Sequence, residues 1–183
     1  MNRFPRIGLA SVLLAMVLAT AVVFHSPTVT LAASSKVGAK LHAFMGQTWN
    51  PPIIPPVELL RTFRAPLSIF GAGHRGVDYL TTDGMVALAP GSGTVAFSGL
   101  VALKPVVAIQ HAGGLKTAME PVCGVLPPGT PVLAGQVVGV VCGKGYLSHC
   151  MPALCLHFSL RNGRGYLSPE LLFGDLQPSR VVS

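Results

Sequence analysis

Charged residues are scarce in this chain: they make up 10% of its 183 residues, and only six are acidic. Aromatic residues are also few, at 7%, with a single tryptophan. The basic residues are scattered, and they lack the interleaved aromatic residues of a platform for single-stranded nucleic acid. We therefore expect no nucleic-acid partner, and we interpret the formal net charge of +7 as a mildly basic surface that suits an anionic partner.

The chain also lacks the composition of a helical bundle, because glycine (21) and proline (16) are frequent, together with β-branched residues. Turn residues recur about every 8–12 residues, a spacing typical of an all-β sandwich or barrel. Only residues 168–173 favour a short helix, with Ser168 as its cap and Pro169 in its first position. We predict strands at residues 76–80, 85–89, 94–97, 106–110, 115–122 and 154–161, and a strand pair within 132–141 joined by a turn at Ala134 and Gly135.

No charge interrupts the apolar run of residues 7–24, which follows Arg3 and Arg6. Small residues offer two possible cleavage contexts, one at 19–21 within the run and one at 31–34 after it. This order predicts a secretory signal peptide over residues 1–33 or, if the segment is retained, an N-terminal membrane anchor. Either outcome gives the rest of the chain a secreted or extracytoplasmic location. Paired prolines predict a Pro-rich linker over residues 34–56, which leaves a domain at 57–176 and a C-terminal tail at 177–183.

The sequence contains no C-x-x-C pair, which argues against a zinc site built from its four cysteines. An even number of cysteines in an exported domain favours two disulfides instead, and four cysteines allow three pairings. Cys150 and Cys155 flank a loop that contains a proline and can close locally, which leaves Cys123 to pair with Cys142.

His74 and Asp78 stand four residues apart around Gly76. In a straight strand they would share a face about 13 Å apart, whereas a bend at Gly76 would bring both to one metal ion. His157 lies in the predicted strand 154–161, where a lone histidine is usually a structural residue. Together the three side chains form a zinc-type ligand set that leaves one position open, which is the arrangement of a catalytic site.

These residues resemble the LytM/lysostaphin-type zinc endopeptidases. Residues 73–79 read Gly-His-Arg-Gly-Val-Asp-Tyr and match the H-x-x-x-D motif of that family. Residues 85–95 are similar to its next hairpin, residues 131–141 to its G-Q-x-x-G strand, and residues 156–158 to the end of its H-x-H motif. The resemblance covers residues 57–175. It implies an antiparallel β hybrid barrel-sandwich (the duplicated hybrid motif), zinc bound by His74, Asp78 and His157, and peptides of peptidoglycan as the substrate.

The chain departs from this family at two positions that carry imidazoles there. Cys155 stands where the family has the first histidine of H-x-H, and residues 117–122 replace its Y-x-H-L segment. The chain thus resembles a divergent, actinobacterial-like branch. Glu120 and His149 are our candidates to take over proton transfer. The alternative interpretation of Glu120 is an ion pair with a nearby Arg or Lys, and that of His149 is an exposed loop position. We interpret His111 as a turn or surface residue.

Two functions follow from this set of residues. The first is an exported zinc metalloendopeptidase that acts on cell-wall peptides. We expect it to be a monomer whose only membrane contact would be an uncleaved N-terminal segment. The second is a catalytically impaired module that binds peptidoglycan or regulates another cell-wall hydrolase, which the missing imidazoles favour. The sequence argues against a third function, a lipoyl- or biotinyl-carrier domain, because Lys116 and Met119 do not form the tight hairpin turn that such a carrier needs.

Overall fold

A computed structural model describes residues 46–68, 70–146, 148–163 and 165–173 of the chain. The expected leader or anchor at 1–33, the first part of the linker and the tail at 177–183 lie outside these residues. Within the described ranges, no helix has both the length and the apolar character needed to cross a membrane. Apart from two short 3-10 helices, the regular secondary structure of the described residues consists of antiparallel strands, which confirms the all-β prediction.

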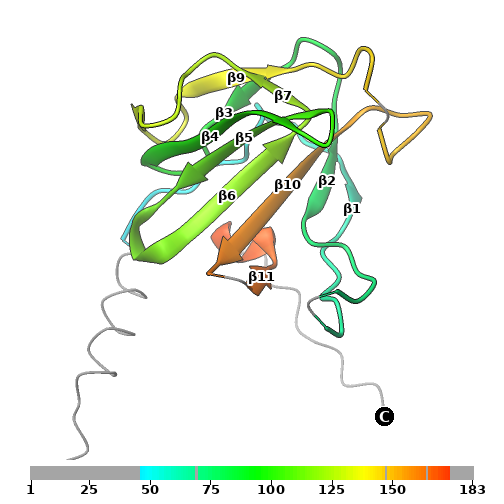
Figure 1. Cartoon of the computed structure of the whole chain (residues 1–183), viewed down its shortest axis with the longest axis horizontal. Coiled ribbons are helices and arrows are strands. Elements are labelled where there is room, and N and C mark those ends of the chain that lie inside the picture. Colours follow the sequence, from blue (N-terminus) through cyan, green and yellow to red (C-terminus); the bar gives the residue numbers. More distant parts are fainter. Residues whose placement is uncertain (1–45, 69, 147, 164, 174–183) are drawn as a thin grey trace, which may run out of the picture. The chain divides into compact units, whose positions relative to one another are not determined.

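The larger sheet has eight strands, and its centre carries the strands that matter for the site (Figure 1). Strand β10 lies between β2 and β6, and all three run antiparallel to their neighbours. In sheet order the strands are β1 (Leu59–Arg61), β2 (Val77–Leu80), β10 (Cys155–Asn162), β6 (Leu115–Glu120), β5 (Lys104–Gln110), β4 (Gly93–Val101) and β8 (Pro131–Val132), and β11 (Gly165–Leu167) pairs with β10.

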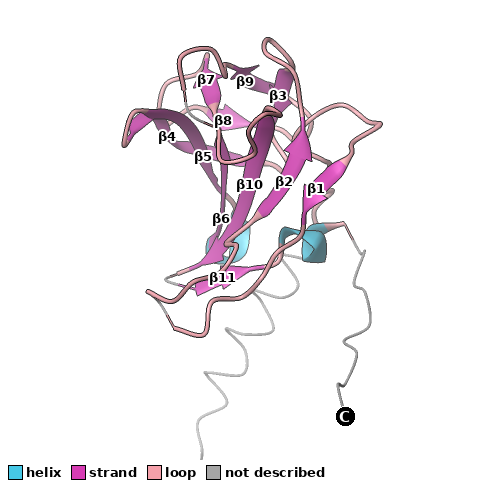
Figure 2. Cartoon of the chain, turned by 90° about the vertical axis from the view of Figure 1, so that its right-hand side faces the viewer, coloured by secondary structure: helices cyan, strands magenta, loops and turns pink. Residues whose placement is uncertain are grey.

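A second sheet of three strands consists of β3 (Val86–Leu88), β9 (Val137–Val141) and β7 (Val122–Gly124). Figures 1 and 2 show it near the top of both views, above β6 and β10. The helical content of the described residues is limited to two short 3-10 helices, η1 (Ala112–Gly114) and η2 (Pro169–Leu172).

The alternation of side chains along the central strands separates a core face from a site face. On β6 the side chains of Leu115, Thr117 and Met119 are buried, while Lys116 and Glu120 are only half-buried. On β10, Leu156 and Phe158 flank His157 in the sequence. Both point into the hydrophobic core and are fully buried. Because successive side chains of a strand point to opposite faces, His157 and Glu120 lie on the face away from this core.

The prediction that two strands within residues 132–141 pair with each other is wrong. Strand β8 pairs with β4 in the large sheet, whereas β9 pairs with β3 and β7 in the small one. The turn between them has Gly135 at a φ of 80°, and the Gly135 N–H donates to the carbonyl of Ala89 at 2.8 Å. This bond ties the turn to the end of β3, so that the two strands diverge into different sheets instead of closing a hairpin.

Two further expectations need correction at the ends of the domain. The packed domain begins before residue 57, because Ile53 is buried in the core and Trp49 packs against it. Backbone bonds from Asn50 to Pro90 and from Leu88 to Pro52, both 2.8 Å, hold this segment in place. At the other end β11 follows the last predicted strand, and the predicted helix is a single 3-10 turn in which Ser168 makes no capping bond to the backbone.

His111 is buried, with 4% of its surface exposed, and is not the turn or surface residue expected from the sequence. Its Nδ1 lies 2.9 Å from the carbonyl of Ser92 and its Nε2 lies 2.7 Å from Thr117 Oγ1. The Trp49 ring meets it edge-on at 4.9 Å between centroids. Burial lowers the pKa of His111, and the bond to Ser92 opposes this shift without cancelling it.

Candidate metal centre

The bend at Gly76 brings His74 and Asp78 to one place, as predicted. His74 is held by a backbone bridge to Arg64, with bonds of 2.8 and 2.9 Å, while Asp78 already belongs to β2. A Cβ atom at Gly76 would lie 2.3 Å from the carbonyl oxygen of Phe158 and 2.7 Å from the His157 ring. Only glycine therefore allows the chain to bend this close to β10.

The sheet register adds His157 to this pair. His157 lies directly opposite Asp78 on one side and opposite Glu120 on the other. Residues opposite each other in antiparallel strands have side chains on the same face, so Asp78, His157 and Glu120 form a row across three strands.

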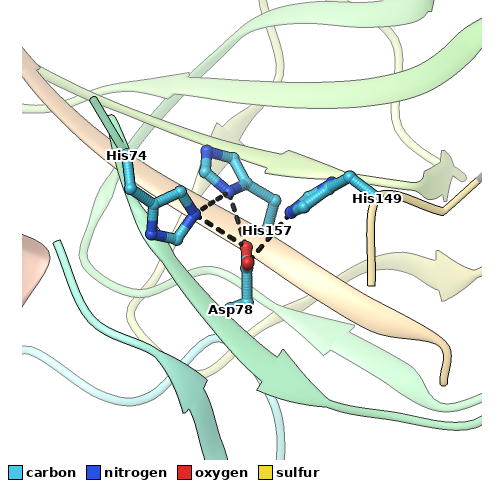
Figure 3. Close-up of side chains that lie close together, drawn as sticks. All are labelled: His74, Asp78, His149 and His157. Carbon is cyan, nitrogen blue, oxygen red and sulfur yellow. Dashed lines mark hydrogen bonds and ion pairs between the residues drawn. The ribbon is translucent and has the colours of Figure 1, made fainter. Parts of the chain in front are cut away.

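Three ligand atoms converge at this row (Figure 3). His74 Nε2 lies 3.3 Å from His157 Nδ1 and 3.2 Å from Asp78 Oδ1, and His157 Nδ1 lies 2.7 Å from the same Asp78 oxygen. Side chains from positions far apart in the sequence thus form a triangle of one carboxylate oxygen and two imidazole nitrogens.

The surroundings fix the tautomer of His74. Its Nδ1 lies 2.7 Å from the backbone carbonyl of Thr62, which can only accept, so this nitrogen carries the proton. The lone pair of Nε2 then points to Asp78 and His157. A backbone carbonyl on the second nitrogen is the usual support of a metal-ligating histidine.

The electrostatics keep Asp78 ionised although it is fully buried. Burial by itself would raise the pKa of this carboxyl, but hydrogen bonds donated by His157 and His149, with their charge, outweigh it and lower the pKa to about 2. A buried anion surrounded by imidazoles is a place where a cation is stabilised.

The residues fit a zinc ion. Zinc bonds of about 2.0–2.2 Å in a tetrahedral site place neighbouring ligand atoms about 3.3–3.6 Å apart. The two distances of His74 Nε2, 3.3 and 3.2 Å, agree with this spacing. The 2.7 Å contact of His157 with Asp78 is a hydrogen bond that a cation would replace, with release of the shared proton.

Both predicted disulfides are present, Cys123–Cys142 and Cys150–Cys155. The sulfur atoms of Cys150 and Cys155 lie close enough to Asp78 and His149 to form a second group with metal-ligand geometry. Their bond to each other removes both thiolates, however, which supports the preference for disulfides over cysteine ligation.

His149 joins the centre from the loop between β9 and β10. Its Nε2–H donates to Asp78 Oδ2 at 2.9 Å, and all four ligand atoms of His74, Asp78, His149 and His157 lie within 4.8 Å of one another. It contacts the second carboxylate oxygen of Asp78 and so stands beside the triangle formed by the other three residues (Figure 3). His149 does occupy the exposed loop position considered as the alternative, with 36% of its side chain exposed, yet its ring is bonded to Asp78.

Glu120 is not among the ligand atoms that cluster in the described part of the chain. Its Oε1 accepts a hydrogen bond from Lys104 Nζ at 3.4 Å, which is the ion pair considered as the alternative to a catalytic role. A small hollow beside the metal centre nevertheless includes Glu120 and His149 in its walls. The remaining residues of that hollow are Lys104, Pro121, Tyr146, Ser148 and Cys155.

The sequence profile of Peptidase family M23 matches residues 72–169, which include every side chain of the triangle. The chain belongs to this family. Members are metal-dependent peptidases, and the M23 chain described here carries a group of residues that can hold a metal. The family expected from the sequence is thereby confirmed.

The chain is also similar to one protein known by its sequence and to several solved structures. The uncharacterized protein Rv2891 of Mycobacterium tuberculosis is 39% identical over 122 residues, or 64% of this chain and 48% of that protein. The chain thus spans about half the length of the curated relatives it matches. The catalytic domain of the antimicrobial peptidase lysostaphin from Staphylococcus simulans matches with a TM-score of 0.53 and 22% identity, over 65% of this chain and 93% of that one.

A chain of the SpoIIQ–SpoIIIAH pore-forming complex gives a TM-score of 0.58 at 21% identity, covering 69% of this chain and 90% of that one. At such identities the likeness shows the fold alone. The lysostaphin-type fold predicted from the sequence is confirmed.

Two contacts of the centre escaped the sequence, although His149 itself was among the candidate residues. The Thr62 carbonyl carries no side-chain signal, since any residue at that position would offer the same oxygen. The contact of His149 with Asp78 joins residues 71 positions apart. Its only signal is its place beside Cys150, because a disulfide to Cys155 brings residue 149 towards the strand of His157.

Proposed function

We propose that this chain is an exported zinc metalloendopeptidase that hydrolyses peptides of bacterial peptidoglycan. The observation that carries the proposal is the convergence of His74 Nε2, His157 Nδ1 and Asp78 Oδ1 within 3.3 Å. Membership of Peptidase family M23 supports the hydrolysis of peptides, and the net charge of +7 suits an anionic cell wall. The apolar run behind Arg3 and Arg6 supports export.

Zinc would be held by His74, Asp78 and His157, with a further position left for substrate. When bound, zinc supplies Lewis acidity that polarises a peptide carbonyl and acidifies water. The Thr62 carbonyl keeps the proton of His74 on Nδ1 and thereby keeps Nε2 available. Asp78 supplies the negative charge that retains the cation.

Proton transfer falls to His149 and Glu120 in this proposal. Nε2 of His149 already holds a proton towards Asp78, so it is placed to give that proton to the leaving amine. The Glu120 carboxylate lines the same hollow, and as an anion paired with Lys104 it can accept a proton from the attacking water. The two groups would replace the imidazoles that the chain lacks at positions 155 and 117–122.

The test measures new amino groups released from purified bacterial sacculi. We expect release that stops when a chelator removes the metal and returns when zinc is restored. His149→Gln and Glu120→Gln should each lower the rate by about 10²–10⁴-fold with the zinc content unchanged, because general acid–base catalysis contributes that much. The exposed Glu58→Gln serves as the matched control and should behave as the wild type. Absence of zinc-dependent release would refute the proposal.

The alternative is a zinc-stabilised module that binds peptidoglycan without cleaving it or regulates another hydrolase. The bond of His149 to Asp78 favours this function, because an imidazole so close to the metal position can also hinder substrate. The same assay separates the two proposals. A module of this kind would bind zinc and sacculi, yet release no amines at any zinc concentration.

A further inference from the structure

We infer that the Cys150–Cys155 disulfide is the positioning element that holds His149 at the metal centre. This inference rests on the proposed function of that centre and adds how its loop-borne imidazole is kept in place. His149 directly precedes Cys150, and Cys155 is the first residue of β10, the strand that carries His157. The disulfide therefore connects the residue beside one imidazole to the strand that carries another.

The atoms around the disulfide show how this connection acts. The sulfur of Cys150 lies 3.6 Å from Asp78 Oδ2, and the sulfur of Cys155 lies 3.9 Å from His149 Nε2. Both cysteines are buried, with 8% and 1% of their surface exposed, while the side chain of His149 is 36% exposed. The buried sulfur pair thus lies against both the His149 imidazole and the Asp78 carboxylate to which that imidazole is bonded.

The segment that carries His149 folds mainly on itself. The backbone N–H groups of Tyr146, Met151 and Ala153 donate to carbonyls of the same segment, at 3.2, 3.4 and 3.1 Å. Its described backbone bonds to the rest of the domain lie near its ends, where Gly143 donates to Asp83 and Thr81 donates to the Leu154 carbonyl. The disulfide ties the middle of this segment to β10. If the disulfide were absent, holding His149 in one position would cost the conformational entropy of the loop.

The experiment compares Cys150→Ala/Cys155→Ala with wild type in the full chain, using nitrogen-15 NMR of the histidine rings and zinc analysis. We expect the double variant to keep its zinc while the His149 ring loses the spectroscopic signature of its Nε2–H bond to Asp78. Amine release should fall to the level of His149→Gln. Adding His149→Gln to the double variant should then cause no further loss, because both changes remove the same imidazole.

The second disulfide provides a matched control. Cys123→Ala/Cys142→Ala removes the bond at the start of the same segment, and this variant should keep the His149 ring signature. If Cys150→Ala/Cys155→Ala fails to fold, wild type is titrated with a dithiol while the carbon-13 shifts of the cysteine Cβ atoms report each disulfide. The His149 signal should then change together with the signals of Cys150 and Cys155, independently of those of Cys123 and Cys142.

A His149 signature that survives opening of the Cys150–Cys155 bond would overturn the inference, as would losses that add when His149→Gln is combined with the double variant. If oxidised wild type releases no amines, the proposed peptidase function fails. The ring signature of His149 still decides the positioning role in that case, because it requires no turnover.

Discussion

Asp78 connects the residues of the centre to one another. Its two oxygens face His74 and His157 on one side and His149 on the other, at 2.7 to 3.2 Å. The carboxylate has no exposed surface, and its pKa of about 2 shows that the imidazoles more than offset the cost of burying its charge. We therefore expect this residue to be the most sensitive position for metal binding.

Replacing a residue that only hydrogen-bonds to a metal ligand typically lowers metal affinity by about 10–100-fold. Because Asp78 would be a ligand itself, Asp78→Asn should lower zinc affinity by more than this. The amide has similar size but no negative charge to retain the cation. Competition with a chromophoric zinc chelator measures the change, and Glu58→Gln, an exposed carboxylate, serves as the control. Unchanged zinc affinity in Asp78→Asn would remove Asp78 from the ligand set.

His111 predicts a pH dependence of stability that is separate from the metal centre. Burial lowers its pKa in the folded state, so between that value and 6.5 the unfolded chain binds more protons. Its contribution to stability is complete above about pH 6.5 and is lost as the pH falls towards the lowered folded pKa. We expect the free energy of unfolding of metal-free protein to decrease between pH 7.5 and 5.5.

Denaturant unfolding at the two pH values measures this decrease, and His111→Gln isolates the contribution of His111. The variant will be less stable overall because it disturbs the bonds to Ser92 and Thr117, but its stability should fall less between the two pH values. An equal decrease in both proteins would show that other groups cause the pH dependence.

At the scale of the elements, the bend at Gly76, just before β2, lies close against β10. This close approach decides whether the side chains of His74, Asp78 and His157 meet. Gly76→Ala would place a Cβ atom 2.3 Å from the Phe158 carbonyl oxygen. We expect a loss of about 1–3 kcal/mol of stability from overpacking, together with weaker zinc binding because His74 and His157 must move apart. Thermal unfolding and zinc competition measure the two effects.

Gly165→Ala is the matched control, because a Cβ at that position has its nearest neighbour, the Asn162 carbonyl oxygen, at an ordinary 3.6 Å. It should retain the zinc affinity of the wild type. If Gly76→Ala also retains that affinity, the bend does not set the geometry of the ligands.

Pairing between elements was the part of the fold least accessible from the sequence. The positions of most strands follow from alternation and from turn residues, as for β2, β5 and β6. The sheet in which β8 and β9 each pair does not follow from the sequence. The turn at Gly135 is compatible both with a hairpin and with a crossing to the second sheet. The choice depends on the tertiary bond to Ala89, which no local pattern contains.

For the whole molecule, the sequence predicted the convergence of His74, Asp78 and His157 better than the contacts of the groups around them. His74 and Asp78 share a short motif with its glycine, and the alternation of β10 gives the face of His157. The bond of His149 to Asp78 and the pairing of Glu120 with Lys104 arise only when the loop and the sheet are folded together. Charge partners across strands follow from register, which single-sequence patterns define weakly.

The most direct test of the account is a crystal structure of the zinc-loaded protein with anomalous diffraction measured at the zinc absorption edge. We predict a single strong peak at about 2.0–2.2 Å from His74 Nε2, Asp78 Oδ1 and His157 Nδ1. A peak at any other site, or zinc-loaded crystals in which these three atoms do not share one ion, would contradict the account.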